Sequence, residues 1–180
     1  MTQVTINNQA KLSQHLTSSS VATLGHSSQL DGSRLSPHFT LGELCKTSVK
    51  TKDGNIPSHV YIENLKRLCG WLEMLRSAWN NRYGEGNDPI IINSGYRSAE
   101  VNRAVGGVAT SNHLTGCAVD IRVKDICQLI RYATILLDIS EESGEAFDEL
   151  LIEHNARGAI WLHFAVRPSG NRKKVLQISS

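Results

Sequence analysis

The chain has 180 residues, of which 40% are hydrophobic, and its formal net charge is +2 at pH 7. This length suits one domain, and the charge is too small to argue for nucleic acid as a partner. No apolar run approaches the length of a membrane span. The four cysteines form no Cys-x-x-Cys pair, which favours free buried thiols over a sulfur-bound structural zinc. These features agree with a small soluble enzyme, and we expect a monomer.

The first 35 residues differ in composition from the rest of the chain. Ser, Thr, Gln and Asn dominate there, and apolar residues occur without a period. We expect residues 1–35 to form a flexible segment that catalysis does not need, followed by one domain over residues 36–180. The N-terminus has no basic start followed by an apolar stretch, so no secretory signal is expected. This predicts cytoplasmic synthesis.

Two helices are expected in the first half of the domain. Residues 40–43, Thr-Leu-Gly-Glu, form a capping-box pattern that predicts a short helix ending near Lys46. The helix with the clearest apolar stripe has Ser58 as a candidate N-cap, and residues 84–88 are expected to end it. Its apolar residues recur at intervals of three and four along one face: Tyr61, Leu65, Leu68, Leu72, Leu75 and Trp79.

The second half of the domain alternates strands and helices. Residues 89–93 predict a short buried strand, and Ser98 can cap a helix over 99–105. Residues 117–123 alternate as a strand does, and an apolar helix face follows: Ile126, Leu129, Ile130, Ala133 and Leu137. Residues 149–153 and 159–166 predict a hairpin. Together these elements indicate an α+β domain with a small, mainly antiparallel sheet packed with helices.

His113, Asp120 and His163 form a candidate metal-ligand set. Gly116 separates the first two residues and lets the chain turn from a loop into a strand, where Asp120 projects opposite the apolar side chains. In the last strand, His163 likewise lies on the face opposite the core residues. Two imidazoles and a carboxylate supply three ligands, and a catalytic zinc needs three plus an open position for water.

The order Ser111-x-His113-x-x-Gly116-x-Ala118-x-Asp120 resembles the metal-binding signature of the M15 family of zinc peptidases. Residues 94–98, Ser-Gly-Tyr-Arg-Ser, and 161–163, Trp-Leu-His, are similar to two further blocks of that family, so the resemblance covers about residues 36–170. It implies a hedgehog/DD-peptidase-like fold, Zn²⁺ as cofactor, and a peptidoglycan stem peptide or muropeptide as substrate. The similar subgroup is bacterial and phage-encoded.

The general base is less clearly marked. Many relatives place a glutamate three residues before the last histidine or a histidine two before it, and Ile160 and Trp161 occupy those positions here. Glu153 is our candidate base, because it shares a face with His163 if residue 153 pairs with residue 161. A register slip of one residue would turn His154 inward instead.

Four more polar residues lie near these motifs. Arg97 is a candidate catalytic residue, because its guanidinium suits a peptide carboxylate or carbonyl; the alternative is that it braces its own loop. Ser111 is interpreted as a group that orients His113 or its loop. Asp148 and Glu149 are interpreted as exposed charges.

The leading hypothesis is a zinc metallopeptidase that acts on peptidoglycan, as a carboxypeptidase or an endopeptidase. Without a signal peptide it fits either a phage or prophage lysis enzyme that acts on the cell wall after release, or a cytoplasmic enzyme that acts on wall fragments or dipeptides. D-Ala-D-Ala, L-Ala-D-Glu and cross-link bonds all stay open as its target. One alternative is a non-catalytic, metal-containing binding module of the same fold. Another is a phage structural component that carries the domain at a wall-penetrating tip.

Overall fold

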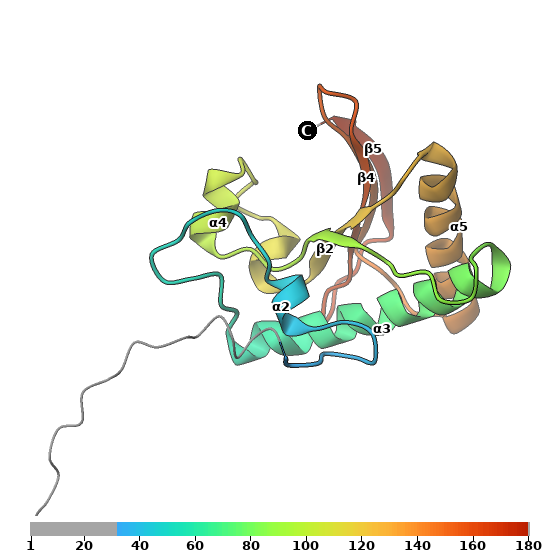
Figure 1. Ribbon diagram of the computed structural model, residues 1–180, viewed down its shortest axis with the longest axis horizontal. Helices are drawn as coiled ribbons and strands as arrows, with labels where there is room; N and C mark the ends of the chain where they lie inside the picture. The colour runs from blue at the N-terminus through green and yellow to red at the C-terminus, as the bar shows by residue number, and fades with distance from the viewer. Residues whose placement is uncertain (1–31, 180) are drawn as a thin grey trace, which may run out of the picture.

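A computed structural model describes residues 32–179 of the chain (Figure 1). The segment expected to be flexible, residues 1–35, therefore lies almost wholly outside the described residues, and its dispensability stays a prediction. The helices are α2 (Leu41–Leu44), α3 (His59–Arg82), α4 (Ala99–Ala104), η1 (the 3-10 helix Asn112–Thr115) and α5 (Ile126–Ser143). The strands are β1 (Ile92–Ser94), β2 (Ala118–Arg122), β3 (Glu149–His154), β4 (Ile160–Ala165) and β5 (Lys174–Ser179).

The strands form one sheet in the order β1-β2-β4-β3-β5. The first three pairings are antiparallel, whereas β5 runs parallel to β3. The predicted α+β class with a mainly antiparallel sheet is confirmed; the C-terminal strand β5 was not predicted. In Figure 1, α4 and α5 lie on opposite sides of β4, and α3 runs along one end of the strands. Within residues 32–179, no helix combines the length and apolarity needed to span a bilayer.

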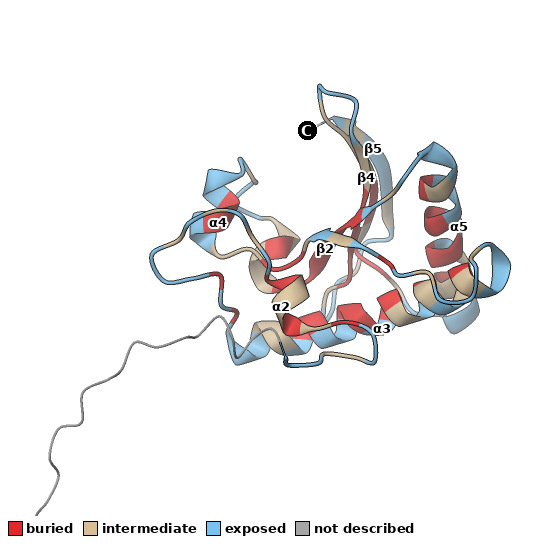
Figure 2. Ribbon diagram, in the orientation of Figure 1, coloured by how far each residue is buried: buried red, intermediate tan, exposed pale blue. Residues whose placement is uncertain are grey.

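Helix α3 supplies much of the core, and its predicted boundaries are confirmed. Ser58 Oγ accepts a hydrogen bond from the Tyr61 backbone N–H, which caps the first turn. The face of α3 turned toward the strands is buried (Figure 2). All of the predicted stripe except Tyr61 is buried there. Each fully buried leucine contributes about 1.5–3 kcal/mol to stability.

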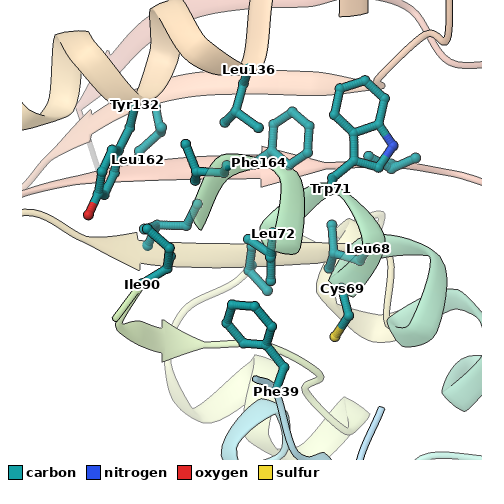
Figure 3. Packing of buried hydrophobic residues seen from close by; sticks show 14 of the residues in the cluster. Phe39, Leu68, Cys69, Trp71, Leu72, Ile90, Tyr132, Leu136, Leu162 and Phe164 are labelled. Carbon is teal, nitrogen blue, oxygen red and sulfur yellow. The ribbon is translucent and has the colours of Figure 1, made fainter. Parts of the chain in front are cut away.

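The core fixes strand β4 in place. Leu162 and Phe164 are fully buried on one face of β4, and Phe164 packs against Trp71 of α3 with ring centroids 5.4 Å apart (Figure 3). Phe147, just before β3, lies against the same two rings. Because side chains alternate along a strand, burial of Leu162 and Phe164 obliges His163 between them to face the other way.

The buried face of α5 agrees only in part with the predicted one. Ile126 and Ile130 are 50% and 53% exposed, and Leu137 is also exposed. Leu129 and Ala133 of the predicted stripe are buried, and the rest of the buried face is formed by Tyr132, Ile135, Leu136 and Ser140. This helix carries apolar residues around most of its circumference, so the 3.6-residue period does not single out one face. Tertiary packing selects the face that is buried. The Tyr132 and Trp79 rings pack edge to face, with their centroids 4.9 Å apart.

The turn at Gly116 connects η1 to β2. Ser111 caps η1 by accepting a hydrogen bond from the His113 N–H, in agreement with its predicted role. Gly116 ends η1 with φ of 70°, in the left-handed region. A Cβ at this position would lie 2.7 Å from the Tyr61 carbonyl oxygen and 3.1 Å from a Leu65 side-chain carbon. The turn therefore requires glycine both for its backbone conformation and for the close approach of α3.

We predict that Gly116→Ala lowers the free energy of unfolding by about 2–5 kcal/mol, combining the left-handed backbone penalty with the steric clash. Gly106→Ala is the matched control, because Gly106 has φ of 76° and a Cβ there would meet nothing within 4 Å. The control should lose only about 1–2 kcal/mol. Chemical denaturation of the metal-free proteins measures both values, and equal losses would contradict the close approach to α3.

Candidate metal centre

Three buried side chains from three elements converge at one point. His113 comes from η1, Asp120 from β2 and His163 from β4, and Asp120 pairs directly with His163 across the two strands. His113 Nε2 lies 3.2 Å from Asp120 Oδ1, and His163 Nδ1 lies 3.0 Å from the same oxygen. The three candidate ligand atoms all lie within 4.8 Å of one another. The structure thus brings together the whole set that the sequence proposed.

This spacing fits a small metal ion. Ligands about 2.1 Å from a tetrahedral zinc lie about 3.4 Å from each other. The separations of 3.0 and 3.2 Å from the shared Asp120 oxygen need only a small outward adjustment to reach that value. Within residues 32–179, no other group of three His, Cys, Asp or Glu side chains meets this criterion. The donor set of two nitrogens and one oxygen is typical of catalytic zinc.

The orientation of the His113 ring is set by the backbone. Its Nδ1 lies 2.6 Å from the Gly95 carbonyl oxygen, so Nδ1–H donates there and the Nε2 lone pair faces Asp120. The Gly95 backbone packs directly against the short helix α2. A Cβ on Gly95 would collide with the Leu44 carbonyl oxygen, so only glycine allows this close approach. The Arg97 backbone N–H also donates to the His113 carbonyl at 3.1 Å. These contacts favour the His113 tautomer that a metal at Nε2 requires.

Arg97 takes a position that neither sequence-based alternative foresaw. Its Nη2 donates to Asp120 Oδ2, and its Nε donates to Ser94 Oγ at 2.8 Å. The guanidinium therefore contacts the candidate ligand itself rather than the carbonyls of its own loop. This contact leaves Asp120 Oδ1 directed at the two imidazoles. Whether Arg97 also contacts a substrate stays a prediction.

The electrostatics of the site keep the Asp120 carboxylate ionised, as a metal ligand must be. Burial alone would raise the pKa of Asp120, but His113 and His163 outweigh it and hold that pKa below its usual range. Burial lowers the pKa of His113. Burial also acts to lower the pKa of His163, but its contacts with Asp120 and Glu149 outweigh this and raise it to about 9. Without metal, Asp120 and His163 thus form an ion pair, and a bound metal would displace the His163 proton.

Glu153 lies beside these groups. The strand register pairs Glu153 with Trp161 and Leu151 with His163, so the slip that would turn His154 inward does not occur. Glu153 Oε1 lies 3.9 Å from His163 Nδ1, on the side of the imidazole that faces Asp120. Burial raises the pKa of Glu153, and its attraction to His163 only partly offsets the effect. This is the placement expected if residue 153 pairs with residue 161.

The interpretation of Asp148 and Glu149 as exposed charges is wrong. Asp148 is fully buried, and Arg172 binds it through two hydrogen bonds of 2.8 and 2.7 Å. Glu149 is half-buried, and its Oε2 lies 3.7 Å from His163 Nε2. Alternation along β3 already places Glu149 on the same face as Glu153, and that signal could have assigned Glu149 to the site. The partner Arg172 lies outside every predicted element, so the sequence offered no comparable signal for it.

Comparison with known proteins gives two matches. A model of the peptidase M15 family matches residues 37–140. A zinc D-Ala-D-Ala carboxypeptidase from Streptomyces albus G is 30% identical over 101 residues, which cover 56% of this chain and 37% of that protein. The chain thus aligns with little more than a third of that relative's length. The family match contains His113 and Asp120 and ends before Glu153 and His163, so it does not cover β3 and β4.

We predict that His113→Ala abolishes zinc retention, because two remaining ligands and a vacated buried pocket hold the ion poorly. Metal analysis after dialysis should find one zinc per wild-type chain and almost none in the variant. His59→Ala is the control, since His59 is exposed on the first turn of α3. Stoichiometric zinc in His113→Ala would refute the ligand assignment.

Proposed function

The chain belongs to the peptidase M15 family, and on that premise we propose that it is a zinc-dependent peptidase that hydrolyses peptide bonds in peptidoglycan stem peptides. The observation that carries this proposal is the convergence of His113, Asp120 and His163 with the Glu153 carboxylate directly beside them. The relative from Streptomyces albus G is itself named as a zinc D-Ala-D-Ala carboxypeptidase. That name supports the choice of metal and the class of substrate.

We assign zinc to His113 Nε2, an Asp120 carboxylate oxygen and His163 Nδ1. A zinc ion held there would acidify a bound water and polarise the scissile carbonyl. The chain's own contribution is to hold the two imidazoles in the required orientation. The Gly95 carbonyl fixes the His113 ring, and pairing of β2 with β4 keeps Asp120 opposite His163. All three side chains are buried, so bulk water has little access to the ligand atoms.

Glu153 is the proposed general base. Its Oε1 lies on the metal side of His163, within reach of a water molecule bound at the open coordination position. Its partly buried carboxylate has a raised pKa, which makes it a better proton acceptor than an exposed glutamate. Asp120 is not available for this step, because both of its oxygens are engaged. Glu153 Oε1 would take the proton of the water and pass it to the leaving amine.

Arg97 is proposed to help bind the substrate. Its Nε and Nη2 are used by Ser94 and Asp120, but a guanidinium has five N–H donors. The remaining donors can bind a carboxylate or carbonyl of the stem peptide. The hollow beside this side chain measures about 190 Å³ and includes Lys46, Asn93 and Val101 in its lining. The same residue would thus orient a metal ligand and hold the peptide.

The exact bond cleaved is a separate part of the proposal. The named activity of the relative favours the D-Ala-D-Ala bond of a carboxypeptidase substrate. Cleavage of L-Ala-D-Glu or of a cross-link would be endopeptidase activity from the same centre. The non-catalytic alternative is disfavoured by the position of Glu153, because a module that only retained metal would not need a carboxylate there. The phage or prophage lysis role stays a prediction.

Digestion of defined muropeptides tests the proposal. The zinc-loaded full chain is incubated with pentapeptide and cross-linked muropeptides, and mass spectrometry identifies the products. Loss of one alanine from the pentapeptide would show D,D-carboxypeptidase activity, whereas fragments cut within the stem or cross-link would show an endopeptidase. Asp120→Asn serves as the inactive control. An unchanged set of muropeptides with zinc-loaded protein would contradict a peptidase and favour the binding module.

We predict that Glu153→Gln lowers turnover by about 10²-fold or more, which is the contribution typical of a positioned general base. Zinc should remain bound, because Glu153 is not one of the three ligands. Steady-state kinetics on the cleaved muropeptide, with metal analysis of the same sample, measures both effects. Glu141→Gln, a neutralised exposed glutamate near the end of α5, is the matched control. Wild-type turnover in Glu153→Gln would move the base to another residue.

A further inference from the structure

The His163 imidazole lies between two carboxylates of β3. Leu151 is paired directly with His163, and Glu149 and Glu153 flank Leu151 on the same strand. Glu153 Oε1 is 3.9 Å from His163 Nδ1, whereas Glu149 Oε2 is 3.7 Å from His163 Nε2. Each ring nitrogen therefore faces a different carboxylate. Only the Nδ1 side faces Asp120 and the proposed metal position.

The Nε2 atom of His163 is a buried polar atom without a hydrogen-bond partner among the described residues. A histidine that binds metal through one nitrogen almost always donates the N–H of the other to a carboxylate, a carbonyl or water. For His113 the Gly95 carbonyl has that role. For His163, Glu149 Oε2 is in place, about 0.5 Å beyond normal hydrogen-bond length. A small rotation of either side chain would close this gap.

Glu149 is itself held by three donors. Arg172 Nη2 donates to its Oε1 at 2.8 Å, and Lys174 Nζ lies 3.4 Å from the same oxygen. Asn112 Nδ2 donates to its Oε2 at 3.0 Å, the oxygen that faces His163. These contacts come from β5, from the segment before it and from η1. A carboxylate fixed from three directions presents one oxygen to the imidazole in a defined place.

Buried Asp148 anchors these donors in turn. Both of its oxygens bind Arg172, and its Oδ2 also accepts a hydrogen bond from Asn112 at 2.8 Å. Asn112 immediately precedes His113 in the chain. The network of Asp148, Glu149, Asn112 and Arg172 therefore connects the backbone that carries one proposed ligand to the ring of another.

The geometry points to Glu149 as a positioning residue that accepts the Nε2–H of His163 and so holds Nδ1 toward the metal, with Arg172 and Asn112 fixing the carboxylate. This inference rests on the proposed function, because it assumes zinc at His113, Asp120 and His163. It also gives the C-terminal strand β5 and the segment before it a part in metal binding. Those residues lie outside the region that the family model matches.

Zinc affinity of three variants tests this inference, measured by competition with a chromogenic chelator. Glu149→Leu removes the acceptor and should weaken zinc binding toward the upper end of the 10–100-fold range typical of such partners. Glu149→Gln keeps an acceptor oxygen without the charge and should fall near the tenfold end. Arg172→Gln leaves Glu149 in place but loosens it, so a loss in the same direction is expected. Glu63→Gln, an exposed glutamate paired with Lys66 on α3, should bind zinc as the wild type does.

A second readout separates positioning from a merely structural ion-pair network. In zinc-loaded protein with ¹⁵N-labelled histidine, the His163 Nε2–H proton should be observed by NMR and be protected from exchange with solvent. That protection should be lost in Glu149→Leu and partly kept in Glu149→Gln. If Glu149→Leu does not fold, the Gln variant decides by the same two measurements.

The outcomes are distinguishable from failure of the proposed function. A wild-type chain that binds no zinc would refute the metal centre itself. Tight zinc binding by the wild type, with unchanged affinity and an equally protected Nε2–H in both Glu149 variants, would overturn the role of Glu149 alone. Graded loss of affinity from Gln to Leu, with loss of the protected proton, supports it.

Discussion

The site depends on the register of β4 between its two neighbours. Pairing with β2 sets His163 opposite Asp120, and pairing with β3 sets Glu149 and Glu153 on the two sides of the same imidazole. A slip of one residue on either side would send these groups to the opposite face of the sheet. Burial of Leu162 and Phe164 against the helices prevents such a slip, since the slipped strand would expose them and bury His163 in the core. The hydrophobic core thereby determines the geometry of a polar site.

The sequence was sufficient where a residue type has a specific local reason. Only glycine suits the turn at residue 116 that connects η1 to β2. Its position between His113 and Asp120 therefore indicated that the chain turns there and brings these two side chains together. Ser58 and Ser98 marked helix starts through the hydrogen bonds that their side chains accept. Alternation in the last strand placed His163 correctly. Pairing of residue 153 with 161 was open from sequence, and the structure shows it.

The sequence was insufficient where tertiary packing decides between equal local choices. On α5, several apolar faces compete, and the contact of Tyr132 with Trp79 selects the buried one. The residues before β5, Pro168-Ser169-Gly170-Asn171, are typical of a turn, but no local pattern indicates that the strand after them pairs parallel with β3. The edge position of β5 also leaves Val175 and Leu176 about half exposed. The charge of buried Asp148 is paired with Arg172, which lies 24 residues away in the sequence, and Asn112 also donates to it. A sequence pattern among neighbouring residues cannot predict a partner that lies so far away in the chain.

The proposed active site depends on a single ion shared by three side chains. Anomalous diffraction at the zinc edge from crystals of the zinc-loaded chain tests this most directly. We predict one strong peak within about 2.0–2.2 Å of His113 Nε2, an Asp120 carboxylate oxygen and His163 Nδ1, with the Glu153 carboxylate facing the fourth position. A zinc peak elsewhere on the chain, or no ordered zinc between these three side chains, would contradict the proposed metal centre.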